Sequence, residues 1–165
     1  MQSLRTMSFW LIGLSLFLSG CSGQNAEEDP LKFASRTSQA KNQDTYDQQV
    51  AEMQAGTLAT DSFVLDRAWL EGSNLMVKVS YGGGCQQHLF RLVWPEAIIA
   101  IYPPVFEVIL SHDGQGDMCR AIVTETLVFD LASPELGFNS QVIADMHVIL
   151  VNGSNPNEKT EMLRL

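Results

Sequence analysis

Two cysteines and two histidines have a spacing that could build a small polar site. Cys85 comes three residues before His88, and Cys119 comes seven residues after His112. Cys85-x2-His88 and His112-x6-Cys119 together would supply the four sulfur and nitrogen ligands of a tetrahedral zinc site. The other chemistry open to these residues is a Cys85–Cys119 disulfide, which stabilises by roughly 4 kcal/mol in the chain-entropy model. A reduced Cys85 beside His88 would be a third arrangement, a nucleophile with its base.

Glycines surround these residues. Three in a row, Gly82 to Gly84, lead into Cys85, and such a run is costly unless positive φ or a close backbone approach requires it. We expect a bulged turn that aims Cys85 at Cys119, with an anion-binding nest of backbone N–H groups as the alternative. The segment 112–117 is interpreted as a glycine-rich turn, because it lacks the Gly and Glu that an EF-hand calcium loop needs.

The strands that would position the two histidines follow from alternation of apolar and polar residues. His88 is in phase with Phe90, Leu92 and Trp94, and His112 is in phase with Phe106, Val108 and Leu110. If the two strands are antiparallel neighbours, the pattern predicts that His88 opposes His112, Phe90 opposes Leu110 and Trp94 opposes Phe106. Leu75, Val77, Val79 and Tyr81 form a third core-facing set, with charged Lys78, Arg91 and Glu107 on outer faces.

The chain from residue 61 reads as a series of strands separated by turns. The predicted strands are Ser62–Leu70, Leu75–Tyr81, His88–Trp94, Val105–His112, Cys119–Leu131, Val142–Val151 and Glu158–Leu163, with a further short apolar run at Ala97–Tyr102. Glu71-Gly-Ser-Asn74 predicts a tight hairpin with Gly72 in a type II′ turn, and 152–156 predicts another hairpin loop. This pattern predicts an all-β fold: a single immunoglobulin-like β-sandwich of seven or eight antiparallel strands at 61–165.

The N-terminus has the features of a secretory signal peptide. A short start with one cation, Arg5, precedes an uncharged apolar run at 8–18, which is too short to span a membrane as a helix, since that needs about 20 residues. Leu18-Ser-Gly-Cys21 then looks like a bacterial lipobox, which implies a signal peptide at 1–20, cleavage before Cys21 and acylation of Cys21. Because Ser22 and not Asp follows, the resemblance implies the periplasmic face of the outer membrane in a Gram-negative cell.

Polar residues dominate after the lipidated cysteine. The segment 21–60 has too few apolar side chains to offset the entropy of ordering, so most of it is expected to be a flexible tether. One helix is predicted inside it, from Asp44 to Ala55, stopped by Gly56. An oxidising compartment beyond the membrane favours the disulfide over zinc.

Composition excludes some classes of function. The 165 residues carry a formal net charge of −9, which argues against a nucleic-acid-binding protein because no basic stripe is present. The predicted domain lacks the Gly-x-Ser-x-Gly, His-Glu-x-x-His and Ser-x-x-Lys motifs of common hydrolases. We therefore expect a non-enzymatic lipoprotein that binds an unidentified ligand or envelope protein without a cofactor. A zinc-binding lipoprotein using Cys85, His88, His112 and Cys119 is the alternative.

The combination of motifs resembles a known family. Tyr81-Gly-Gly-Gly-Cys85-x-x-His88-x-Phe90-x-Leu92, followed by Leu110-x-His112 and Asp117-x-Cys119-x-Ala121, is similar to the β-sandwich domain of NigD-like bacterial lipoproteins. The resemblance covers residues 75–131 and the lipidated start. It implies a fold and a compartment, and no biochemical activity comes with it.

Overall fold

The computed structural model describes residues 34–96 and 102–164, which form eight strands and two helices. The elements are β1 (Arg36–Lys41), α1 (Gln43–Ala55), β2 (Phe63–Glu71), β3 (Asn74–Gly83), β4 (Leu89–Trp94), β5 (Val105–Asp113), β6 (Ala121–Asp130), α2 (Ser140–Asp145), β7 (His147–Asn152) and β8 (Asn155–Arg164). The fold is all-β, which confirms the predicted class. None of the helices in these two ranges is long and apolar enough to cross a membrane.

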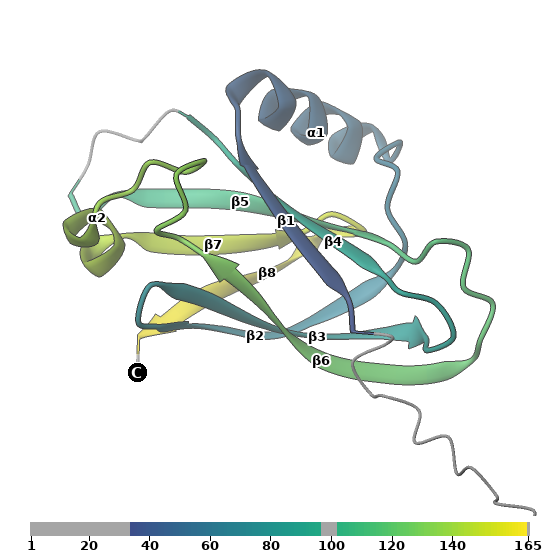
Figure 1. Ribbon diagram of the computed structural model, residues 1–165. Coiled ribbons are helices and arrows are strands. Elements are labelled where there is room, and N and C mark those ends of the chain that lie inside the picture. Colours follow the sequence, from purple (N-terminus) through teal and green to yellow (C-terminus); the bar gives the residue numbers. More distant parts are fainter. Residues whose placement is uncertain (1–33, 97–101, 165) are drawn as a thin grey trace, which may run out of the picture.

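The strands belong to one sheet, in the order β1-β4-β5-β7-β8-β2-β3-β6. The sheet curls until its two edge strands meet: the Thr37 hydroxyl donates to the Val128 carbonyl at 3.1 Å, and the Gln39 amide donates to the Asp130 carbonyl at 2.6 Å. Side chains therefore close the seam between β1 and β6, and the result is a nearly closed barrel. In Figure 1, β4, β5 and β7 face β2, β3 and β6 across the core.

Strand direction differs from the prediction. The pairs β1/β4, β5/β7 and β2/β8 are parallel, so the expected antiparallel immunoglobulin-like sandwich is wrong in topology although the strand count is eight. A parallel neighbour needs a long connection, and such connections cannot be deduced from the alternation of one strand.

The core contains the residues that alternation predicted. The predicted inner residues of β3, β4 and β5 are all buried, and the outer residues Lys78, Arg91 and Glu107 are exposed. The register of β4 and β5 is different: Phe90 pairs with His112, and Leu92 pairs with Leu110. The predicted pairing is therefore displaced by two residues, a shift that leaves every side chain on its expected face.

The segment predicted as a mostly flexible tether contains regular structure. Strand β1 and helix α1 lie within 21–60, so the part of that segment that the structure describes belongs to the fold and not to a tether. The helix itself confirms the prediction: the Asn42 side chain accepts from the Thr45 N–H at 2.8 Å, and Gly56 ends it with φ of 69°. Strand β1 was missed because its sequence is polar and its pairing with β4 uses backbone groups.

One predicted strand is half helix. The segment expected to run from Val142 to Val151 begins with α2, where the Asn139 side chain caps the N–H of Val142 at 2.9 Å, and only β7 is extended. The apolar run at 97–101 and the whole signal and lipobox region, Cys21 included, lie outside the described residues.

Both predicted hairpins are present. Gly72 has φ of 62° between β2 and β3 and Ser73 does not have positive φ, as a type II′ turn requires. Between β7 and β8, the fully buried Asn152 donates its amide to the Phe63 carbonyl and to the Glu158 carboxylate, each at 2.8 Å. These bonds fix the loop against the start of β2.

Candidate functional site

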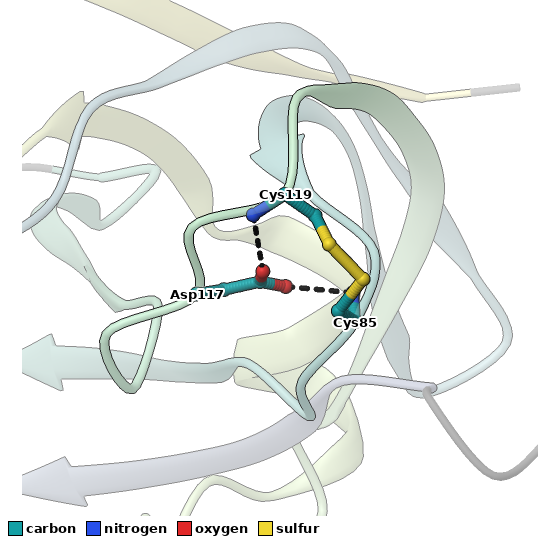
Figure 2. Close-up of side chains that lie close together, drawn as sticks. All are labelled: Cys85, Asp117 and Cys119. Atoms are coloured by element: carbon teal, nitrogen blue, oxygen red, sulfur yellow. Dashed lines mark hydrogen bonds between the residues drawn. A yellow bond between two sulfur atoms is a disulfide. The ribbon is translucent and has the colours of Figure 1, made fainter.

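A disulfide joins Cys85 to Cys119, with their Cα atoms 5.9 Å apart (Figure 2). Strands β3 and β6 are antiparallel neighbours whose last paired residues are Gly83 and Ala121, so the two cysteines extend the same pair of strands by two residues. The bond therefore lies at the end of the barrel where β3 leaves the sheet. This is the pairing that the sequence favoured.

Asp117 occupies the loop that the disulfide closes. Its Oδ1 accepts from the N–H of Cys119 at 2.8 Å, and its Oδ2 accepts from the N–H groups of Cys85 at 2.8 Å and Gln86 at 2.9 Å. Its side chain is 1% exposed. These backbone donors, chiefly that of Cys119, hold the pKa of the Asp117 carboxyl well below its usual range.

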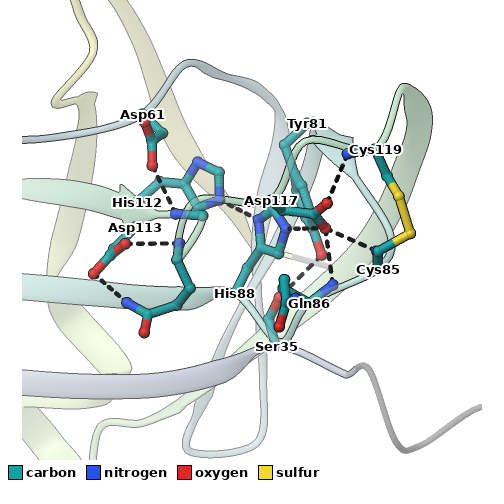
Figure 3. A network of polar contacts seen from close by, with 12 residues as sticks. Ser35, Asp61, Tyr81, Cys85, Gln86, His88, His112, Asp113, Asp117 and Cys119 are labelled. Atoms are coloured by element: carbon teal, nitrogen blue, oxygen red, sulfur yellow. Dashed lines mark hydrogen bonds and ion pairs between the residues drawn. A yellow bond between two sulfur atoms is a disulfide. The ribbon is translucent and has the colours of Figure 1, made fainter.

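A pair of buried histidines continues from this carboxylate (Figure 3). His88 Nε2 lies 3.2 Å from Asp117 Oδ2, and His88 Nδ1 lies 2.7 Å from His112 Nε2. The two residues are 1% and 2% exposed. Burial, and then the neighbouring His88, lower the pKa of His112, which favours the neutral form of that ring.

The bonding pattern determines the tautomers. When both rings are neutral, His88 donates Nε2–H to Asp117 and accepts from His112 Nε2–H at Nδ1. His112 Nδ1 is then an acceptor, and no hydrogen-bond donor reaches it from the described residues. The charge of Asp117 thus orients the whole chain of rings.

Aromatic rings complete the enclosure. The Phe90 ring stacks on His112 with centroids 4.4 Å apart, and the Tyr81 ring lies 4.5 Å from His88. The Tyr81 hydroxyl donates to Glu125 Oε1 at 2.8 Å and lies 3.0 Å from the Ser35 hydroxyl, which links the cluster to the start of β1. Burial raises the pKa of Tyr81 to about 12.

Gly83 makes the packing of His88 possible. It has φ of 147°, and a Cβ placed on it would lie 2.5 Å from His88 Nε2. The prediction that the glycine run meets positive φ or a close approach is confirmed on both counts. The backbone N–H groups that follow do bind an anion, as the nest alternative expected, and the anion is the chain's own Asp117.

The structure does not assemble the predicted zinc ligands. The two sulfurs are bonded to each other, so Cys85, His88, His112 and Cys119 do not present four free ligands. Potential ligand atoms of Cys85, Asp117 and Cys119 lie within 4.8 Å of one another, but two of them belong to the same disulfide. A Cys85/His88 nucleophile pair meets the same obstacle, because both cysteines of the described ranges are consumed by the bond.

The sequence did not reveal the role of Asp117. It appeared there as the end of a glycine-rich turn and in the Asp117-x-Cys119 element of the family resemblance, without a role of its own. The available signal was its position two residues before Cys119, since Asp side chains commonly accept from the N–H two residues on. That spacing accounts for one of its bonds, and only the fold adds the bonds from Cys85 and Gln86.

Comparison with known proteins gives structural neighbours of low similarity. No protein-family model matches the chain, and no curated protein is significantly similar to it. Seven chains of solved structures are similar, and three of them are the following. A protein of unknown function from Bacteroides vulgatus is 15% identical, with a TM-score of 0.44 and coverage of 78% of this chain and 54% of the other. A NigD-like immunity protein from Bacteroides caccae is 17% identical, with a TM-score of 0.45 and coverage of 73% and 52%. A protein described as a putative toxin-related protein from Parabacteroides distasonis is 17% identical, with a TM-score of 0.45 and coverage of 77% and 58%.

These likenesses are distant, and the chain spans little more than half the length of the three proteins. At this similarity no activity or partner transfers from them. The neighbours of this chain nevertheless include a NigD-like protein, the family whose motifs the sequence resembles.

Proposed function

We propose that this protein is a lipoprotein of the bacterial envelope, held at the periplasmic face of the outer membrane by acylated Cys21. Its barrel is a non-enzymatic module that binds another component of the envelope. The observation that carries this proposal is the Cys85–Cys119 disulfide. Disulfides of this kind persist in oxidising compartments and are rare in the cytosol, so the bond supports export of the chain.

The enclosed cluster supports a structural role for the polar residues. A catalytic acid, base or nucleophile must come within hydrogen-bond reach of its substrate. Asp117 is saturated by backbone donors, His88 has a partner on each ring nitrogen, and both side chains are nearly inaccessible. The cluster therefore orders the end of the barrel, and binding falls to the outer surface.

Acylation is tested by replacing the lipid-bearing residue. The full chain and its Cys21→Ser variant are expressed with radiolabelled palmitate, and the membranes are separated by density. We expect label and outer-membrane association in the wild type and loss of both in Cys21→Ser. Ser22→Ala serves as the control that keeps them. Label retained in Cys21→Ser, or a wild-type protein without label, would overturn the anchoring.

The non-enzymatic role is tested separately. The purified oxidised protein is screened against periplasmic substrate classes such as esters, peptides, glycosides and phosphate esters. We expect no turnover that depends on the cluster. Turnover that disappears in His88→Ala while the variant keeps its fold would refute the non-enzymatic role and leave the anchoring untouched.

A further inference from the structure

Strand β6 is an open edge of the barrel. It pairs with β3 along its whole length, from Ala121 opposite Gly83 to Asp130 opposite Asn74, and no other strand of the described residues pairs with it. Strand β1 forms its hydrogen bonds to β6 through the side chains of Thr37 and Gln39, and the N–H of Ser35, just before β1, donates to Glu125 Oε2 at 3.4 Å. Figure 1 shows no described element beyond the outer side of β6 in its first half.

The unpaired backbone groups can be assigned from these contacts. The carbonyls of Val128 and Asp130 accept from β1, so the even-numbered residues of β6 point their backbone groups away from β3. By the same alternation Ile122, Thr124 and Thr126 direct their N–H and carbonyl groups outward. No residue of the described ranges forms a hydrogen bond to those groups.

This edge lacks the protection that edge strands usually carry. Its pairing with β3 has no bulge, and residues 121–126 contain no proline and no lysine. The only charge there, Glu125, is held by the Tyr81 hydroxyl. Ile122 is 77% exposed on the outer face. The other edge, β1, is short and carries Arg36 and Lys41 at its ends, so the two edges differ in how they discourage pairing.

We propose that β6 pairs with β6 of a second copy of this chain, antiparallel and about a twofold axis at Thr124. In this register Thr124 faces Thr124 of the second copy, and Ile122 faces Thr126 of the second copy. Ile122, Thr124 and Thr126 then each exchange backbone hydrogen bonds with an outward-facing residue of the second copy.

A second copy is the occupant because the edge is complementary to itself. The side chains brought together are Thr124 with itself, Ile122 with Thr126, and Val123 with Glu125, so no two like charges face each other. If the axis lay at Val123, Thr126 would face Arg120 of the second copy. Arg120 precedes β6, so this register would pair fewer residues of the strand. Five paired residues bury less surface than a standard protein interface, which buries about 1,600 Å². The dimer is therefore expected to be weak and reversible.

Cysteine cross-linking tests the register directly. Opposed residues of an antiparallel hydrogen-bonded pair have Cα atoms about 5.5 Å apart, within the range that a disulfide spans. Thr124→Cys, Ile122→Cys and Thr126→Cys are introduced separately into the full chain with its native cysteines. The proteins are oxidised mildly in detergent, with micelles in excess, and the dimers are quantified on non-reducing gels.

We expect Thr124→Cys to form covalent dimers several-fold faster than Ile122→Cys or Thr126→Cys alone. Mixing the last two variants should restore fast cross-linking, because they face each other across the axis. Equal rates for all three single variants, or no rate gain in the mixture, would overturn the proposal. A Thr124→Pro variant loses the outward N–H and also the hydroxyl that lies 2.9 Å from the Ser80 hydroxyl, whereas Thr124→Val loses the hydroxyl and keeps the N–H. Thr124→Pro should therefore lower self-association measured by analytical ultracentrifugation, whereas Thr124→Val should not. These outcomes do not depend on acylation of Cys21, since detergent-solubilised protein is compared with itself.

Discussion

Replacing Gly83 with alanine should disrupt the polar cluster. The new Cβ would lie 2.5 Å from His88 Nε2 and 2.6 Å from His88 Cε1, much closer than non-bonded atoms approach. The residue has φ of 147°, which L side chains rarely adopt. His88 would have to move, and its bonds to Asp117 and His112 would lengthen or break.

Two costs add in this variant. Backbone strain at positive φ contributes about 1–3 kcal/mol, and overpacking a filled interior contributes about 1–3 kcal/mol. We expect Gly83→Ala to lower the free energy of unfolding by about 2–6 kcal/mol, measured by urea denaturation of the oxidised protein. Gly82→Ala is the matched control, because a Cβ there meets nothing within 4 Å, and it should change stability by less than about 0.5 kcal/mol.

A double-mutant cycle separates the clash from the strain. In a His88→Ala background the ring is gone and only the 3.0 Å contact with Asp117 Oδ2 remains, so Gly83→Ala should cost little more than the strain, about 1–3 kcal/mol. If Gly83→Ala costs the same with and without the His88 ring, the close approach is not what requires glycine here. Equal stability of Gly82→Ala and Gly83→Ala would refute the reasoning altogether.

Three further predictions concern the same molecule. Cys85→Ser and Cys119→Ser should each lower the free energy of unfolding by about 4 kcal/mol in urea melts, and clearly unequal losses would contradict a purely structural bond. Because the pKa of His112 is lowered in the folded state, the unfolded chain binds that proton more readily, so stability should fall as the pH drops below about 6.5. His112→Gln, which does not titrate there, should flatten the slope of unfolding free energy between about pH 6.5 and 5, and an unchanged slope would assign it to other groups. Asn152→Ala should cost about 2–4 kcal/mol by losing the four hydrogen bonds of this buried side chain, whereas exposed Asn155→Ala should cost less than about 0.5 kcal/mol on the same melts.

The sequence predicted the faces of the strands better than their neighbours. Alternation placed Leu75 to Tyr81 and Phe90 to Trp94 with the correct residues inward, because each side chain's face depends only on local strand geometry. The same alternation could not fix the pairing of β4 with β5. A displacement by two residues keeps every side chain on the same face of the sheet, so the alternation of apolar and polar residues cannot distinguish the two registers.

The elements missed by the sequence lack a local hydrophobic signal. Strand β1 has no fully buried side chain and exists because the edge of β4 offers it a backbone partner. Helix α2 occupies an apolar stretch that reads equally well as a strand, and the Asn139 cap was the available cue. Barrel closure depends on contacts between residues about ninety positions apart, such as Thr37 with Val128.

The sequence by itself determined the all-β class, the core faces, the two hairpins, the helix predicted at 44–55 and the favoured cysteine pairing, since each depends on neighbouring residues or on composition. Only the tertiary structure decided that Asp117 and Gly83 belong to one buried cluster with His88 and His112. That cluster requires backbone donors from one loop to meet a carboxylate from another, and the curvature of the barrel brings those two loops together.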